Sequence, residues 1–115
     1  MRPPGELELM LGTLDILVLR TLTWGPRHGY AIAACLRDSA AGSFRVLDGA
    51  LYTSLHRMEA RGLLDSEWGV SPRGKRAKFY RITAAGRSHL KSETERWNAY
   101  VAAVARAMTA VLKPA

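Results

Sequence analysis

The chain of 115 residues contains a single cysteine and lacks the usual features of secreted and membrane proteins. The lone Cys35 cannot form an internal disulfide, and nothing around it suggests a thiol–metal site. No apolar run reaches the roughly 18 residues that a membrane span needs. Residues 1–8 hold two glutamates after Pro-Pro-Gly, which is unlike a secretory signal peptide. We therefore expect a cytoplasmic protein without a membrane partner.

Catalytic constellations are also missing from the chain. The histidines His28, His56 and His89 fall in three different predicted elements, and no metal-ligand spacing links them. There is no glycine-rich phosphate loop and no Gly-x-Ser-x-Gly turn. Glu93 and Glu95 are two residues apart on a predicted helix, so they do not face each other. An enzyme is therefore the least favoured class, and we expect no cofactor and no metal.

Acidic residues are scarce relative to basic ones, and the imbalance is local. The chain has 17 Lys and Arg against 10 Asp and Glu, a net charge of +7, and 48% hydrophobic residues. This size and composition fit one small folded domain. Residues 70–82 hold five cations and no acid. Excess charge can serve solubility alone, but this concentration favours binding to a polyanion.

Apolar periodicity and capping residues predict four helices and one hairpin. The expected helices span residues 14–22, 28 or 29–39, 49–61 and 84–112, and their N-caps include Thr13, Asp48 and Thr83. Cys35 falls on the buried stripe of the second helix as an inert core thiol. Residues 63–69 and 78–83 are rich in β-formers, and Pro72 and Gly74 fix the turn between them.

The third predicted helix has two different faces. Leu51, Leu55 and Met58 form one narrow apolar stripe. The opposite face has no large aliphatic residue, and it carries Gly49, Thr53, His56, Arg57 and Ala60, with Tyr52 at its edge. This face suits a surface pressed against something polar.

The last predicted helix carries a heptad pattern. Its seam residues are spaced four and three apart and are Leu90, Thr94, Trp97, Val101, Val104, Met108 and Val111. The seam could fold back on its own domain, but a core already closed by three helices and a hairpin leaves it unused. We therefore expect it to pair with a second copy of the chain.

This order of elements is that of a winged helix-turn-helix domain, a mostly α fold with a small β-hairpin wing (α+β). We expect residues 1–83 to form a DNA-binding domain and residues 84–115 a dimerisation helix, in one compact unit. One α-helix fits the major groove of B-DNA, so the third helix is the expected reader. The reader residues nearest the bases are expected to be Gly49, Ala50, Thr53 and Ser54.

Other residues are expected to contact phosphates and so to position the reader without reading sequence. Tyr52 and Arg57 belong to this group, although the Tyr52 ring could equally pack in the core with its hydroxyl exposed. The cations of the hairpin tip, together with the neighbouring strand, are Arg73, Lys75, Arg76 and Lys78. They reach phosphates or a flanking minor groove, unless the tip is only a solvated loop.

The sequence closely resembles the PadR-like transcriptional regulators over about residues 9–100. The matching segments are 12–19 (GTLDILVL), 25–30 (GPRHGY), 49–59 (GALYTSLHRME), 62–64 (GLL), 67–69 (EWG) and 76–83 (RAKFYRIT), with Gly86. Tyr30 of the second segment joins the expected DNA-binding set. A single helix after the wing resembles the short subfamily. The family often has Pro where Thr53 stands, and Ala77 interrupts its usual basic run.

The resemblance implies a dimeric repressor that binds a palindromic operator at the nucleoid and is released by a small aromatic effector. It implies that the last helix of each copy packs on the other, and that Trp97 lines an effector pocket at the interface unless it only packs there. The expected interface and effector residues are Leu90, Trp97, Val101, Val104 and Met108. The alternatives are a winged-helix protein-protein adaptor without operator binding and, less favoured, a cationic peripheral membrane protein.

Overall fold

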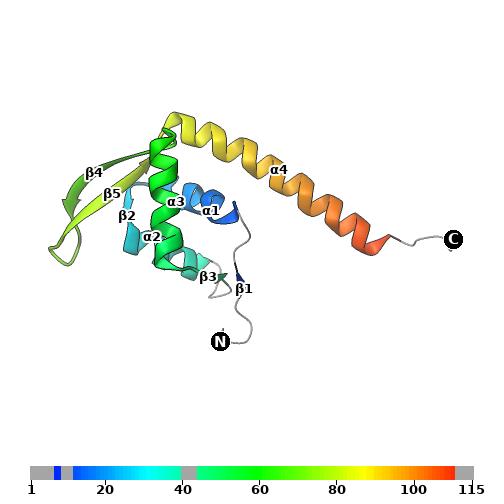
Figure 1. Cartoon of the computed structure of the whole chain (residues 1–115), viewed down its shortest axis with the longest axis horizontal. Helices are drawn as coiled ribbons and strands as arrows, with labels where there is room; N and C mark the ends of the chain where they lie inside the picture. Colours follow the sequence, from blue (N-terminus) through cyan, green and yellow to red (C-terminus); the bar gives the residue numbers. More distant parts are fainter. Residues whose placement is uncertain (1–6, 9–11, 40–43, 111–115) are drawn as a thin grey trace.

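The computed structural model describes residues 7–8, 12–39 and 44–110, and its elements follow the expected order (Figure 1). The helices are α1 (Thr13–Leu22), α2 (Gly29–Ser39), α3 (Asp48–Ala60) and α4 (Ala84–Thr109). The strands are β1 (Leu7–Glu8), β2 (Arg27–His28), β3 (Phe44–Arg45), β4 (Leu64–Val70) and β5 (Arg76–Ile82). The expected winged helix-turn-helix fold is confirmed.

The wing is a sheet of three strands in the order β2-β5-β4. β4 and β5 pair antiparallel from Leu64 opposite Ile82 to Val70 opposite Arg76. β2 adds a short antiparallel edge on the other side of β5, with Arg27 opposite Tyr80. Its two residues are too few for an alternating pattern, so the sequence does not predict this strand. Through β2 the wing is tied directly to the start of α2.

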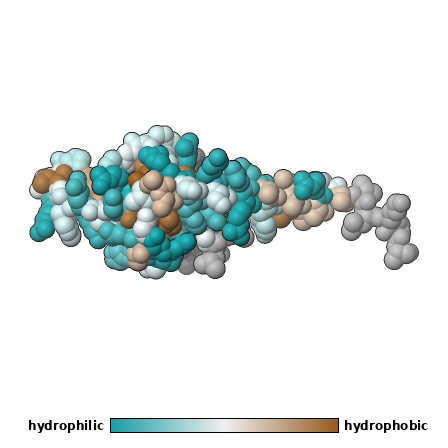
Figure 2. Space-filling model, turned by 90° about the horizontal axis from the view of Figure 1, so that it is seen from above, coloured by the Kyte–Doolittle hydropathy of each residue, from teal (hydrophilic) through white to brown (hydrophobic). Residues whose placement is uncertain are grey.

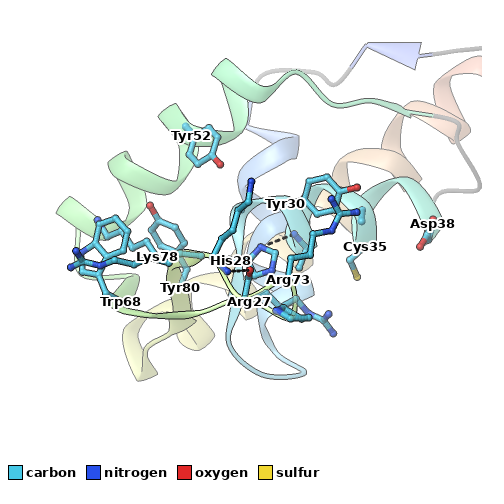
Figure 3. Close-up of a pocket in the computed structure, with 18 of the residues that line it drawn as sticks. Arg27, His28, Tyr30, Cys35, Asp38, Tyr52, Trp68, Arg73, Lys78 and Tyr80 are labelled. Carbon is cyan, nitrogen blue, oxygen red and sulfur yellow. Dashed lines mark hydrogen bonds between the residues drawn. The ribbon is translucent and has the colours of Figure 1, made fainter.

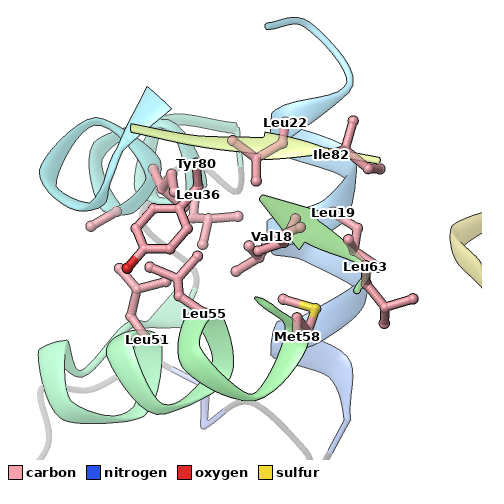
Figure 4. Close-up of a cluster of buried hydrophobic side chains, with 13 residues drawn as sticks. Val18, Leu19, Leu22, Leu36, Leu51, Leu55, Met58, Leu63, Tyr80 and Ile82 are labelled. Atoms are coloured by element: carbon pink, nitrogen blue, oxygen red, sulfur yellow. The ribbon is translucent and has the colours of Figure 1, made fainter. Parts of the chain in front are cut away.

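The hydrophobic core lies between α1, α2, α3 and the base of the wing (Figure 4). The predicted stripe of Leu51, Leu55 and Met58 is confirmed, since each of these side chains is at most 1% exposed. Tyr80 of β5 is also buried among them. Burying a side chain of this size stabilises the fold by about 1.5–3 kcal/mol. α3 is thus fixed by one face, and its opposite face is exposed among the described residues.

Two of the three expected N-caps are wrong, and one is confirmed. Thr83 caps α4, because its hydroxyl accepts a hydrogen bond of 3.0 Å from the backbone N–H of Gly86. Thr13 and Asp48 are instead the first residues of their helices. At α1 the N-cap is Gly12, whose φ of 87° no β-branched residue adopts readily. Asp48 lies in the first turn of α3, where its charge still favours the helix dipole.

α4 projects from the body of the molecule (Figure 1). Its 26 residues span roughly 39 Å at the rise of an α-helix. Gly86 is buried and Leu90 packs against the core, but every residue from 94 to 110 is exposed. The apolar colours along the projecting part of α4 mark side chains that no described part of the chain covers (Figure 2). From Thr94 to Met108 the seam does not fold back on the described domain, and its last expected member, Val111, lies outside the described residues.

Candidate nucleic-acid interface

The outer face of α3 is open, as the pattern predicts. Gly49, Ala50, Thr53 and Arg57 are all exposed on it. Tyr52 is 46% exposed, and its ring packs closely on Gly29 at the start of α2. A Cβ atom added at Gly29 would lie 2.8 Å from the Tyr52 hydroxyl, so a larger residue there would displace the Tyr52 ring from α2. The Tyr52 side chain is therefore half-exposed, and it packs on α2 instead of in the core.

Ser54 does not lie on the outer face. Its side chain is only 1% exposed, and its hydroxyl donates a hydrogen bond of 2.5 Å to Oδ1 of Asp15 on α1. The reason is its position three residues after Leu51, at the edge of the buried stripe. Ser54 therefore positions α3 on α1, and the structure does not present it to a DNA base.

Arg57 shares the same carboxylate. Its Nη2 donates to both oxygens of Asp15, at 2.5 and 2.7 Å, while the side chain stays 49% exposed. A charge-assisted pair of hydrogen bonds holds a guanidinium in one orientation. Arg57 can thus meet a phosphate only from a fixed position. Asp15 lies in the first turn of α1, where its charge favours the helix dipole, and its carboxylate also orders two residues of α3, a contact that the sequence does not predict.

A second carboxylate fastens the wing to the reader helix. Glu59 of α3 accepts hydrogen bonds from Ser66 of β4 and from Nζ of Lys78 on β5, the latter at 3.1 Å. The Ser66 hydrogen bond, followed by Lys78, lowers the pKa of Glu59. The hydrogen bond to Glu59 in turn raises the pKa of Lys78. Lys78 was expected to bind DNA, but it is already paired within the chain.

The Glu59 link predicts a pH-dependent stability difference. Because folding lowers this pKa below its usual 4.5, the link stabilises the fold above that pH and is lost as the pH falls through the folded-state pKa. We expect Glu59→Gln to lower the free energy of unfolding by roughly 0.5–1 kcal/mol at pH 7, since the pair is partly exposed. Urea unfolding at pH 7 and pH 3.5 measures this. An equal difference at both pH values contradicts the ionic role of Glu59.

The wing tip presents the cations that remain free. Its turn is closed by the backbone N–H of Ser71 donating to the carbonyl oxygen of Lys75 at 2.8 Å, and Gly74 has the left-handed φ of 77° that the turn requires. Arg73, Lys75 and Arg76 are exposed. Within the described part of the chain, none of these three forms a salt bridge. The positive charge of the wing is therefore available to a partner.

A groove of about 1250 Å³ separates the wing from α2 and α3 (Figure 3). Tyr30, Cys35 and Tyr52 line its helical side, whereas Trp68 and Arg73 line the wing side. Cys35 is only partly buried, so the expectation of a core thiol is wrong. The same groove thus joins the outer edge of the reader helix to the cationic tip.

The three helices, the β-hairpin wing and the open outer face of α3 define a winged helix-turn-helix protein. The model of the transcriptional regulator PadR-like family matches residues 18–92, and the chain belongs to this family. It is therefore a transcriptional regulator of a DNA-binding class and not an enzyme. Across the residues that the structure describes, no helix is long and apolar enough to cross a membrane.

Individual relatives agree with this family. A PadR family transcriptional regulator from Eggerthella lenta is 32% identical, with a TM-score of 0.76 over 87% of this chain and 85% of that one. A transcriptional regulator from Clostridium thermocellum is 26% identical, with a TM-score of 0.76 over 83% and 89% of the two chains. The transcriptional regulator Rv3488 of Mycobacterium tuberculosis is 48% identical over 50 residues, which are 44% of this chain and 46% of that protein.

Proposed function

We propose that this chain acts as a dimeric repressor that binds a palindromic operator in the cytoplasm. The observation that carries the proposal is the outer face of α3, free of large aliphatic residues, beside a wing tip with unpaired cations. Residues 1–83 supply the DNA contacts, and residues 84–115 join the two copies. Each copy then reads one half-site, and the half-sites lie about one helical turn or a multiple of it apart.

We assign the recognition of DNA bases to the first residues of α3. Gly49 and Ala50 have no bulky side chain, which lets the helix approach closely, and Thr53 offers a hydroxyl and a methyl group to base edges. Tyr30 and Tyr52 supply phenol hydroxyls to phosphates, and Arg57 supplies its fixed guanidinium. In this arrangement the two tyrosines and Arg57 position α3 on the DNA backbone, and the first residues of α3 recognise the bases.

Replacing Thr53 tests the reading role. The variant Thr53→Val keeps the shape of the side chain and removes its hydroxyl. We expect a changed base preference at one position of each half-site, worth about 1–3 kcal/mol of discrimination, with the salt dependence of binding unchanged. Selection of bound sequences from a random DNA pool measures the preference. An identical set of selected sequences contradicts a base contact by Thr53.

The exposed seam of α4 supports dimerisation. Trp97, Val101, Val104 and Met108 are 38%, 45%, 43% and 80% exposed. They extend the row that begins with the packed Leu90. A second copy would cover them, as the heptad spacing predicts. The Trp97 ring stacks on Tyr100 with centroids 6.2 Å apart, so an aromatic effector at this interface would meet a ready aromatic surface.

Charges placed on the seam test the dimer. We expect Val101→Glu with Val104→Glu to give a folded monomer, because two buried carboxylates per copy cannot be accommodated at the seam. Losing the second half-site contact should lower the affinity for the palindrome about 10²–10⁴-fold. Analytical ultracentrifugation and fluorescence anisotropy measure the two effects. The matched control Ala99→Glu with Ala103→Glu, on the opposite face of α4, should remain dimeric.

The same preparations discriminate between DNA binding and a protein-protein adaptor. If the dimer binds no DNA from a random pool or from the region upstream of its own gene, the operator proposal is wrong. Release of bound DNA by an effector at the seam should disappear in Trp97→Ala. Release that is unaffected by this substitution places the effector elsewhere.

A further inference from the structure

The groove that the wing forms with α2 and α3 carries an excess of positive charge. Its lining includes one acid, Asp38, and a set of cations, which are Arg27, Arg73, Lys75, Arg76 and Lys78. Lys78 is paired with Glu59, and the other cations form no salt bridge within the described residues. A concave surface with this balance of charge attracts a negatively charged chain.

An aromatic ring with an arginine over it lies at each end of this groove (Figure 3). At one end the guanidinium of Arg73 lies 5.8 Å from the ring centre of Tyr30, and the His28 ring lies beside Tyr30 with ring centres 6.4 Å apart. At the other end the guanidinium of Arg76 lies 4.6 Å from the ring centre of Trp68. Tyr30 and Trp68 remain 65% and 59% exposed. Each end therefore offers a flat surface for stacking next to an accessible positive charge.

The size of the groove and the separation of its two rings favour an extended occupant. The volume of about 1250 Å³ exceeds the roughly 300–1,000 Å³ of clefts that hold one small molecule. Small and apolar side chains of α2 line the helical side, namely Ala31, Ala34 and Cys35. A molecule that carries several flat groups along a negatively charged chain matches the two rings, the cations and this apolar side at once.

A DNA duplex makes no use of the two rings. Its bases are stacked on one another, so it presents phosphates, sugars and base edges to a protein but no base faces. A single-stranded nucleic acid has the same phosphates and leaves its base faces open. Proteins bind such chains in cationic grooves whose aromatic rings stack on the bases, and arginine guanidinium planes accept bases in the same way.

We propose that this groove binds a single-stranded nucleic acid. One base stacks on the pair formed by Tyr30 and Arg73, another base stacks on the pair formed by Trp68 and Arg76, and the free cations bind the phosphates between them. The proposal goes beyond binding of a duplex operator, because it requires neither an operator sequence nor a dimer. Since Arg73 and Arg76 serve both partners, a bound oligonucleotide and a bound duplex exclude each other.

A comparison of two probes of equal charge tests the role of the bases. Fluorescence anisotropy measures the affinity for a 12-nucleotide oligothymidylate and for an abasic DNA chain of the same length. We expect the oligothymidylate to bind at least about 25-fold more tightly, because each of two stacked bases contributes about fivefold or more. Oligouridylate of the same length tells whether the site prefers RNA or DNA, and it should exceed the abasic chain in the same way. An abasic chain that binds as tightly as both overturns the proposal, since phosphates alone would then account for binding.

Substitutions that leave the charge unchanged identify the stacking rings. Trp68→Ala and Tyr30→Ala should each weaken binding of the oligothymidylate about fivefold or more and leave binding of the abasic chain unchanged. The matched control is Trp24→Ala, because Trp24 is 60% exposed and lies 4.9 Å from the guanidinium of Arg20 but does not line the groove. Trp68→Phe restores a ring and should recover most of the affinity, and circular dichroism checks that each variant is folded. An equal loss in Trp24→Ala and Trp68→Ala overturns the proposal.

Cys35 shows whether the oligonucleotide lies in the groove, because it is the chain's one cysteine and lines the end next to Tyr30 (Figure 3). Its alkylation by iodoacetamide is followed by mass spectrometry. We expect the alkylation to slow about tenfold when oligothymidylate occupies nine-tenths of the sites. An unchanged rate at saturation places the oligonucleotide elsewhere on the cationic surface and overturns the proposal.

Duplex binding by the same proteins separates this proposal from the proposed function. Trp68→Ala should weaken binding of the oligothymidylate much more than binding of an operator duplex, and an equal loss of both contradicts base stacking on Trp68. If the protein binds no duplex but prefers the oligothymidylate to the abasic chain, the groove site stands and the proposed function fails. If it binds an operator duplex and shows no such preference, the proposed function stands and the groove proposal is wrong.

Discussion

Replacing Arg73, Lys75 and Arg76 together by alanine is expected to remove most of the salt-dependent DNA affinity. If each of these cations neutralises one phosphate, a dimer makes six such contacts, and they contribute about −5 to the slope of log K against log salt. Without them that contribution should disappear, leaving a slope of about −2 from Arg57 of the two copies, and the affinity at 50 mM salt should fall about a thousandfold. The loss should be the same for all sequences, since phosphate contacts carry no base information.

Anisotropy titrations from 50 to 300 mM salt measure both quantities. The matched control removes three exposed cations from α4 instead, with Arg87, Lys91 and Arg106 changed to alanine. The control has the same net charge as the wing variant. A control that loses as much affinity as the wing variant would show that only net charge matters. The wing cations would then make no specific contact with phosphates.

Gly86→Ala is expected to destabilise the fold strongly. A Cβ atom at this position would lie 2.1 Å from the carbonyl oxygen of Leu63 and 2.8 Å from Cγ1 of Ile82. The first of these is backbone, and its oxygen also accepts the hydrogen bond from the N–H of Thr83 at 3.1 Å, so it cannot easily move. The start of α4 would have to shift from the base of the wing. We expect a loss of about 3 kcal/mol in the free energy of unfolding.

Urea unfolding followed by circular dichroism measures this loss. The same substitution at Gly49 is the control, because a Cβ atom there meets nothing within 4 Å. Gly49→Ala should leave stability unchanged or raise it by about 0.4–1 kcal/mol. If Gly86→Ala is no less stable than Gly49→Ala, α4 is not fixed to the body through the contact with Leu63.

Sequence patterns correctly predicted those features of the fold that depend on residues close together in the chain. The apolar stripe of α3 and the Thr83 cap depend on residues within a turn of each other, and both are confirmed. The hydrogen bonds of Asp15 join positions 39 and 42 residues apart, and no local pattern contains them. The link from Glu59 to Lys78 spans 19 residues and depends on the course of the hairpin.

The clustering of basic residues predicted the exposed positive surface of the wing tip. The assignments of individual residues to the candidate interface were less accurate. The cationic tip is exposed and unpaired among the described residues, but Lys78 and Arg57 are each held by a carboxylate that the sequence does not place. Ser54 was misplaced although a signal existed, since its spacing from Leu51 marks it as inward-facing. The groove was not predicted at all, because its walls come from α2, α3 and the wing and meet only in the folded chain.

α4 contacts the rest of the described chain only near its N-terminal end. The rotation of the whole helix about its axis is therefore set by the contacts at that end. Each residue inserted between Leu90 and Trp97 would turn the distal apolar row by 100° and lengthen the helix by 1.5 Å. Two protomers joined through that row would then hold their α3 helices in new directions relative to the duplex. In the proposed dimer, insertions and deletions in this short stretch would therefore change the spacing and direction of the two α3 helices while every residue of the winged helix-turn-helix domain stays the same.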